Sequence, residues 1–252
     1  MELKRYFAAV MVLLIVVSAF SVVSVWAQGP PELQRVVFVH YAGKKPPKPP
    51  GGGEENGYFK LISGGVRWKS FPVPIEVNPN NPSDLRTPAV LIAIGWAAEE
   101  WDSGAYSQSL GEAWYGVTPD LFEDRIETTT KTYDDLAWTS DKLDEHNTLV
   151  WGNYPTSGVI AVTIMWYDTA TKTMVEFDVV FDTDYVWSTS GEVGKMDLQN
   201  IVTHELGHGA GLSDLYSNAA NKETMYGYST FGETSKRDLY VGDIQGITRL
   251  YG

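Results

Sequence analysis

The segment 197–216, DLQNIVTHELGHGAGLSDLY, constrains this chain more than any other. Asp197 is a typical helix N-cap, and apolar residues recur after it at helical spacing until glycines end the helix. His204 and His208 lie four residues apart, so they project from one helix face and both imidazoles can reach one metal ion. The segment therefore predicts a domain built around a metal-binding helix.

Glu205 and Asp214 complete the predicted site. Glu205 is one residue further round the helix than His204, where it cannot easily share the ion but can reach a water molecule bound to it. Gly211 lets the backbone turn sharply and brings Asp214, a carboxylate of the kind that zinc accepts, back towards the ion. Catalytic zinc takes three protein ligands and lowers the pKa of a water molecule, whose proton a carboxylate can accept. We predict one catalytic Zn²⁺ bound by His204, His208 and Asp214, with Glu205 as the general base.

The same HExxH spacing also occurs by chance on helices of unrelated proteins. Here half of the chain's four histidines lie in it, and a glycine and a ligand-capable residue follow at suitable positions. We therefore prefer the metal site to the chance alternative. We interpret the other two histidines, His40 and His146, as surface or loop residues.

The N-terminus has the pattern of a secretory signal. Lys4 and Arg5 precede an apolar run, 8–26, and Ala27 ends a stretch with small residues at both cleavage-site positions. We expect processing after Ala27 and a secreted, extracellular protein. The alternative is an uncleaved anchor at the cell surface, because the run approaches the length that spans a bilayer.

Composition divides the rest of the chain. Residues 43–57, GKKPPKPPGGGEENG, are a linker, because prolines favour an extended chain and glycines loosen it. We divide the chain into a signal peptide, 1–27, an N-terminal segment with the linker, 28–65, and a catalytic domain, 66–252. Before the linker, Val36 to Tyr41 could form one short strand, which is too little for an inhibitory pro-domain of its own.

Periodic patterns follow the linker. Thr87-Pro88 begins a helix that continues to Gly104, in which we assign Trp96 and Trp101 to helix-face packing. Two β-rich runs joined by TATKT predict a hairpin. The predicted strands are 71–77, 122–130, 148–151, 159–168 and 174–182, and a last helix covers 241–250. Strand, helix, several strands and two helices indicate an α+β domain with helices packed on one sheet.

Charge and cysteine content exclude several classes of protein. Lys and Arg total 19 against 32 Asp and Glu, a net charge of −13, which excludes the clustered cations of nucleic-acid binding. The absence of cysteine excludes disulfides, thiolate zinc sites and a cysteine nucleophile. The partner that we expect is a protein or peptide substrate, with no nucleic acid, and membrane contact only if the N-terminal segment stays uncleaved.

At these motifs the chain resembles the metzincin metallopeptidases, and the matrixin family most closely, over about 66–252. DLQNIVTHELGHGAGL is similar to the matrixin active-site helix, TMY to the Met-turn carrying Met225, and DIQGITRLYG to the closing helix. GVIAV resembles the edge strand along which the family binds an extended substrate, which implies contacts from Gly158, Val159, Ile160 and Ala161. The resemblance implies a metzincin-like domain: a mostly parallel, five-stranded twisted sheet with an antiparallel edge strand, packed with an active-site helix and a C-terminal helix. We expect a monomer.

The chain departs from the matrixin pattern at its metal positions. Asp214 replaces the usual third histidine and gives an HExxHxxGxxD variant, for which we expect retained zinc binding and altered activity. Val162 and Val180 stand where animal matrixins place histidines for a second, structural zinc, which implies that this site is absent.

Three further differences concern calcium, latency and specificity. Three acidic residues lie in or just after the predicted strand 174–182: Asp178, Asp182 and Asp184. They could bind Ca²⁺ through carboxylate oxygens, or they could be solvated turn residues. Latency through a cysteine cannot occur in a chain without one. Gly227 replaces a proline of the specificity-pocket wall.

The sequence as a whole predicts a secreted zinc-dependent endopeptidase. A catalytically silent surface-binding or adhesion module with the same fold is the rival, against which the intact Glu205 argues. A narrow-specificity processing protease anchored by its N-terminus is a third interpretation.

Overall fold

The computed structural model describes residues 32–43, 58–103 and 120–252. The predicted signal peptide and nearly all of the predicted linker lie outside these residues. Within the described part, no helix has the length and apolar character needed to cross a membrane. Residues 31–252 form one compact unit.

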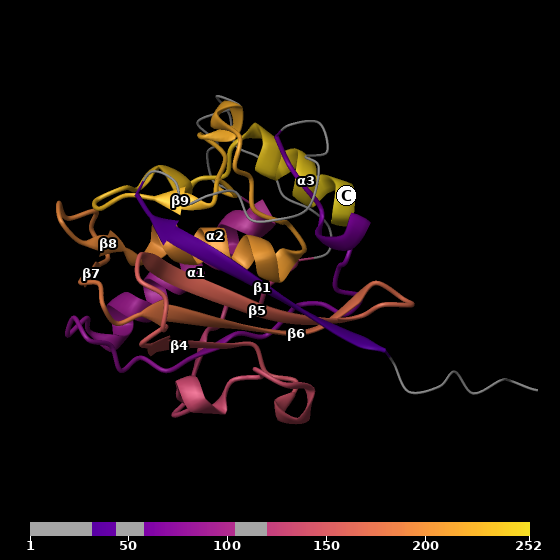
Figure 1. The fold of residues 1–252 in the computed structure, drawn as a ribbon, viewed down its shortest axis with the longest axis horizontal. Helices are drawn as coiled ribbons and strands as arrows, with labels where there is room; N and C mark the ends of the chain where they lie inside the picture. Colours follow the sequence, from indigo (N-terminus) through magenta and orange to yellow (C-terminus); the bar gives the residue numbers. More distant parts are fainter. Residues whose placement is uncertain (1–31, 44–57, 104–119) are drawn as a thin grey trace, which may run out of the picture. The chain divides into compact units, whose positions relative to one another are not determined.

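A seven-stranded sheet runs through this unit in the order β3-β2-β4-β6-β5-β1-β9 (Figure 1). The pairings are parallel from β3 to β6, antiparallel between β6, β5 and β1, and parallel between β1 and β9. The strands are β1 Leu33–Ala42, β2 Glu76–Val77, β3 Glu127–Thr128, β4 Thr148–Gly152, β5 Val159–Asp168, β6 Thr173–Asp182 and β9 Tyr228–Ser229. A separate parallel pair joins β7 (Trp187–Ser188) to β8 (Met196–Asp197).

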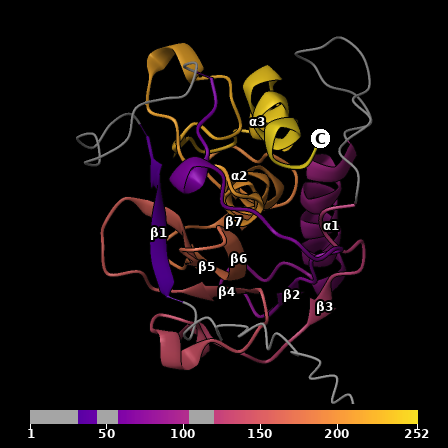
Figure 2. The ribbon, with the colours of Figure 1, turned by 90° about the vertical axis from the view of Figure 1, so that its right-hand side faces the viewer.

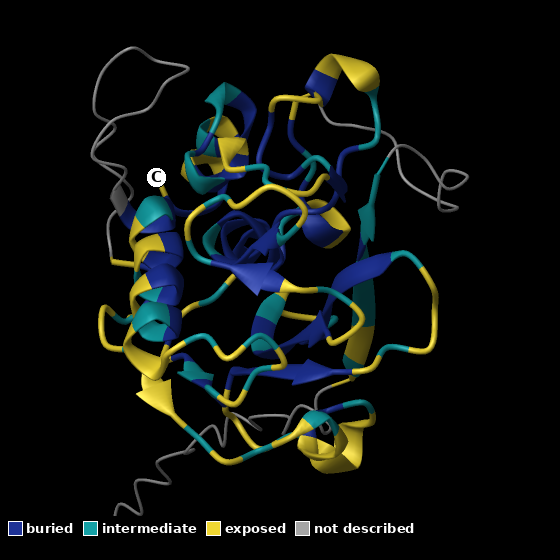
Figure 3. Cartoon of the chain, turned by 90° about the vertical axis from the view of Figure 1, so that its left-hand side faces the viewer, coloured by how far each residue is buried: buried dark blue, intermediate teal, exposed yellow. Residues whose placement is uncertain are grey.

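In the described part of the chain, three α-helices accompany the sheet: α1 Thr87–Ser103, α2 Leu198–Ala210 and the C-terminal α3 Val241–Tyr251. α1 packs against α2, and both contribute to the main hydrophobic core beside the sheet (Figure 2). Helix α2 is buried along almost its whole length, as the dark ribbon at the centre of Figure 3 shows. The predicted fold, a mostly parallel sheet packed with an active-site helix and a C-terminal helix, is confirmed.

The two faces of β5 and β6 meet different surroundings. One face packs on the helices, and the other forms a second apolar cluster beneath residues 133–154. Val162 and Val180 are register partners and lie fully buried in that second cluster. The surroundings of these two valines are therefore hydrophobic.

The strand expected at the edge of the sheet is not at its edge. β5 pairs with β6 on one side and along its length with β1 on the other. β1 lies within the predicted N-terminal segment, 28–65, and pairs in the same sheet as strands of the predicted catalytic domain. The cause is a pairing between segments more than a hundred residues apart, which no local pattern encodes.

Candidate metal centre

Both ends of α2 are fixed by local hydrogen bonds. Asp197 accepts a hydrogen bond from the Asn200 amide at 3.0 Å and is held by the Arg237 guanidinium. At the other end Gly211 has φ of 110°, and its amide donates to the His208 carbonyl at 3.0 Å. A side chain at Gly211 would meet the Val66 carbonyl, so the turn requires glycine. This turn starts the segment that carries residue 214.

The two histidines and Asp214 converge on one point. His204 Nε2 lies 3.2 Å and His208 Nε2 lies 3.5 Å from Asp214 Oδ1, and all three residues are buried. The other ring nitrogen of each histidine donates a hydrogen bond to a backbone carbonyl. Nδ1 of His204 donates to the Thr224 carbonyl at 2.7 Å, and Nδ1 of His208 donates to the Leu212 carbonyl at 2.8 Å. A carbonyl only accepts, so the proton is on Nδ1 and both Nε2 lone pairs face the shared point.

The donor set fits a zinc ion. Among the described residues, His204 Nε2, His208 Nε2 and Asp214 Oδ1 are buried and have no hydrogen-bond partner. Burial lowers the pKa of His204 to about 4, so this imidazole is neutral and able to coordinate. Burial alone would raise the pKa of Asp214, but the adjacent histidines outweigh it and hold that pKa far below its usual range. Burial lowers the pKa of His208, but the charge of Asp214 outweighs it and raises that pKa above its usual value. Two imidazoles and one carboxylate are ligands that zinc accepts.

Asp214 is oriented by its neighbours. Tyr216 donates its hydroxyl hydrogen to Asp214 Oδ2 at 2.9 Å, which leaves Oδ1 for the histidines. A Cβ at Gly227 would lie 2.6 Å from the Tyr216 ring and 3.0 Å from Asp214 Oδ1. The Gly227 amide also donates to the Leu215 carbonyl, which a proline could not do. The space and the hydrogen bond at Gly227 are therefore coupled to the positions of Tyr216 and Asp214.

Glu205 is fully buried beside this centre. Its Oε2 accepts a hydrogen bond from the Thr163 hydroxyl at 2.5 Å, and its Oε1 lies 3.0 Å from His40 Nδ1. Burial raises the pKa of Glu205 to about 7, a value suited to accepting and returning a proton near neutral pH.

His40 is a site residue that our sequence analysis missed, because we assigned it to the surface. It is buried in β1, its ring centroid lies 3.9 Å from that of His204, and its Nε2 lies 3.0 Å from Ser229 Oγ. Phe38, two residues earlier, stacks on His208 at 3.9 Å. The alternation in VVFVHY places Phe38 and His40 on one face of a strand, and this was the available signal. His146, in contrast, is exposed.

Met225 packs against α2 at Gly207. It is buried, and a Cβ at Gly207 would approach its sulfur to 2.2 Å and the Trp101 ring to 2.7 Å. The amide of Met225 donates to Asp243 at 3.0 Å, which ties the turn to α3. Glycine at 207 therefore permits close packing of the methionine against α2.

The remaining predicted site residues have other surroundings. Val159 and Ala161 are covered by β1, so the predicted substrate contacts, Gly158, Val159, Ile160 and Ala161, are not on a free edge. The predicted calcium ligands are Asp178, Asp182 and Asp184. Asp178 accepts backbone hydrogen bonds from Ala137 and Thr148, and Asp182 from Tyr154 and Asp184. Among the described residues, these three acids belong to no group of converging ligand atoms.

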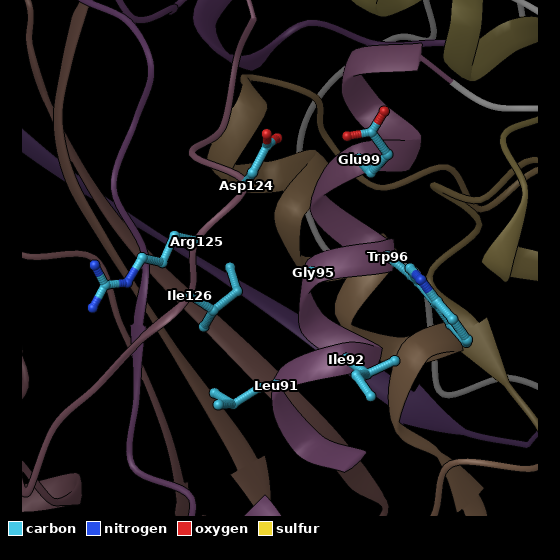
Figure 4. A pocket seen from close by; sticks show the side chains of 8 residues that line it. All are labelled: Leu91, Ile92, Gly95, Trp96, Glu99, Asp124, Arg125 and Ile126. Carbon is cyan, nitrogen blue, oxygen red and sulfur yellow. The ribbon is translucent and has the colours of Figure 1, made fainter. Parts of the chain in front are cut away.

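One hollow lies beside the candidate metal site, and another lies along α1. One, of about 200 Å³, lies beside Asp214 and is bounded by β1 and by Tyr216. The other is a groove of about 460 Å³ between α1 and residues 124–126, shown in Figure 4. Trp96 lines this groove and is 61% exposed, whereas Trp101 is buried, so the expected helix-face packing holds for Trp101 alone. The α1 groove contains none of the predicted metal ligands.

Comparison with known proteins agrees with this geometry. No curated protein matches the chain. Residues 157–252, which include α2, the predicted ligands and α3, match the model of the family described as matrixin, Peptidase_M10. This match supports a matrixin or metzincin family for the chain.

Proposed function

We propose that this protein is a secreted zinc-dependent endopeptidase. The observation that carries the proposal is the convergence of His204, His208 and Asp214, whose buried ligand atoms have no other partner among the described residues. The adjacent Glu205 and the match to matrixin, a family that suggests a zinc metallopeptidase, support the same reaction.

Each residue has a separate part in the proposed reaction. His204, His208 and Asp214 would bind the zinc, which when bound supplies a Lewis acid that polarises a peptide carbonyl and lowers the pKa of water. Glu205 would accept the proton of the attacking water and return it to the leaving amine. Thr163 orients the Glu205 carboxylate through its hydrogen bond.

Substitution of the general base tests this proposal. Zinc content and hydrolysis of a peptide mixture are measured on the same samples of the native chain and of Glu205→Gln, with and without a chelator. We expect native cleavage that the chelator abolishes, and a variant that retains one zinc but has lost at least about 100-fold in rate, the lower range for general-base catalysis. Loss of zinc together with activity would contradict the role of Glu205, and zinc without any cleavage would favour the silent surface-binding module.

Export is the second part of the proposal. The charged start, the apolar run and the small residues before Gln28 support cleavage after Ala27. Protein recovered outside the cell should begin at Gln28. An intact N-terminus at Met1 in a membrane fraction would instead favour the anchored form.

A further inference from the structure

We infer that Lys236 is a positioning residue for the metal site. Its buried ammonium holds the backbone of residues 226–228, and this backbone fixes the Asp214 carboxylate relative to the two histidines. The inference rests on the proposed function, because it concerns the alignment of the residues that would bind the zinc.

Within the described part of the chain, Lys236 is a buried cation whose hydrogen-bond acceptors are uncharged oxygens. Its Nζ donates to the carbonyl of Tyr226 at 2.5 Å, to that of Tyr228 at 2.6 Å and to the hydroxyl of Ser229 at 2.9 Å. The three ammonium hydrogens therefore have three acceptors. Burial of a charge is costly, and an apolar side chain of similar length would avoid this cost. The ammonium therefore needs a role that methionine could not fill.

The backbone that Lys236 holds is the wall beside Asp214. The two carbonyls belong to the residues on either side of Gly227. A Cβ added at Gly227 would lie 3.0 Å from Asp214 Oδ1, the oxygen that faces the two histidines, and 2.6 Å from the ring of Tyr216. Tyr216 in turn donates its hydroxyl hydrogen to Asp214 Oδ2. Because packed interiors transmit strain, a small shift of this backbone would displace both the ligand and the residue that orients it.

Lys236 is itself fixed to the helix that carries both histidines. Its amide donates to Asn200 Oδ1 at 2.8 Å, and Asn200 lies in the first turn of α2. The next residue, Arg237, forms an ion pair with Asp197, the N-cap of that helix. Lys236 therefore connects α2 directly to the wall beside Asp214, so one residue sets the position of the carboxylate relative to the histidines.

The charge of Lys236 also suits a carboxylate ligand. Asp214 brings a negative charge that a third histidine would not bring, and the buried Glu205 adds another. Burial lowers the pKa of this lysine to about 8, and nearby carboxylates oppose that fall, Glu233, Asp214 and Glu205 among them. The ammonium therefore supplies positive charge to the buried region in which the carboxylate ligand and the proposed base lie.

Substitution of Lys236 by methionine tests the inference in the full chain. Zinc affinity is measured by titration, and the absorption spectrum of the Co²⁺-loaded protein reports the ligand geometry independently of activity. We expect Lys236→Met to weaken zinc binding at least about tenfold, as loss of a residue that only orients a metal ligand does, and to shift the cobalt bands. In the zinc-loaded variant, kcat should fall by a larger factor than KM rises, because the ligands are misplaced while the peptide contacts remain.

Two control variants separate alignment of the ligands from general effects. Lys69→Met makes the same substitution at an exposed position. Val77→Ala truncates a buried side chain in β2, which four strands separate from β9 in the order of the sheet. This truncation lowers the free energy of unfolding without contact with residues 226–228. Both controls should retain the native zinc affinity and the native cobalt spectrum.

A double-mutant cycle with Asp214→His tests whether the effect of Lys236 passes through the carboxylate. Residues that act through one another have effects that do not add. In the Asp214→His background, Lys236→Met should weaken zinc binding by a much smaller factor than in the native background. The reason is that an imidazole ligand has no carboxylate oxygen beside Gly227 and no negative charge to compensate.

Three results would overturn the inference and leave the proposed function standing: native zinc affinity and cobalt spectrum in Lys236→Met, an equal loss of affinity in Val77→Ala, or additive effects in the cycle. If Lys236→Met loses its near-ultraviolet circular dichroism, Lys236→Gln decides. Its shorter, uncharged side chain retains a donor, and its zinc affinity must still fall at least about tenfold. A native chain that binds zinc but cleaves no peptide would refute the proposed endopeptidase, while the affinities and cobalt spectra would still decide the role of Lys236.

Discussion

Glu223 and Asp243 form a buried acid pair that should make stability depend on pH. Glu223 Oε2 accepts from the Gly242 amide at 2.8 Å, and the Asp243 carboxylate accepts from the amides of Thr224 and Met225 at 2.6 and 3.0 Å. The pair thus joins the turn containing Met225 to α3. Burial, and then the charge of Asp243, raise the pKa of Glu223 to about 8.

The sign and size of the effect follow from this shift. A carboxyl whose pKa is raised from 4.5 to about 8 on folding retains its proton in the folded chain after the unfolded chain has lost it. Its contribution is complete below about pH 4.5 and is lost as pH rises to about 8. Retention of one proton on folding lowers the free energy of unfolding by about 1.4 kcal/mol for each pH unit in this range.

Glu223→Gln tests this reasoning. Glutamine keeps an acceptor for the Gly242 amide and cannot ionise, so the free energy of unfolding should fall less steeply with pH. Urea denaturation at pH 5, 6, 7 and 8 should show a slope that is smaller than the native slope by about 1.4 kcal/mol per pH unit. Glu127→Gln, at an exposed position of β3, should leave the slope unchanged. Identical slopes for native and Glu223→Gln would refute the assignment of the proton to this pair.

Three further substitutions test the site and its helix. Asp214→Ala should weaken zinc binding in titrations by more than about 100-fold, because loss of a residue that only hydrogen-bonds to a metal ligand already costs about 10–100-fold. Asp214→His should restore zinc binding more fully than turnover. Unchanged zinc affinity in the alanine variant would remove Asp214 from the site. Gly207→Ala should lower the free energy of unfolding, measured in urea, by about 1–3 kcal/mol, because the added Cβ would overlap the Met225 sulfur. A variant more stable than the native chain would contradict this packing. Asp197→Ala should lower the free energy of unfolding by about 1–3 kcal/mol in the same assay, because it removes the N-cap and the carboxylate partner of the Arg237 guanidinium. A loss within about 0.5 kcal/mol would show that neither contact stabilises the helix.

The sequence alone determined the elements whose signals are local. Helix α2 was predicted with its N-cap at Asp197 and its end at Gly209 and Gly211, because capping and periodicity involve neighbouring residues. Gly209 lies inside the helix, and Gly211 ends it in the left-handed conformation. The hairpin of β5 and β6, and the helices α1 and α3, followed for the same reason. The grouping of His204, His208 and Asp214 also needed only one helix and one turn.

Other predictions were too broad because they depended on distant partners. The runs 71–77 and 122–130 predicted two full strands, but β2 and β3 are only two residues each. The rest of these runs is joined by an isolated bridge between Val73 and Phe122. Strand length depends on how far a neighbour continues beside it, which the local residue pattern does not contain.

Only the tertiary structure decided what lies over the metal centre. His40 is 165 residues from Glu205, and the pattern of β1 specifies a strand without specifying its neighbour. The same is true of the buried acids Glu223 and Asp243, whose raised pKa values arise from packing between the turn and α3. Helical contacts are set by spacing along the chain, whereas the pairing of β1 with β5 is set by competition among all available edges of the folded sheet.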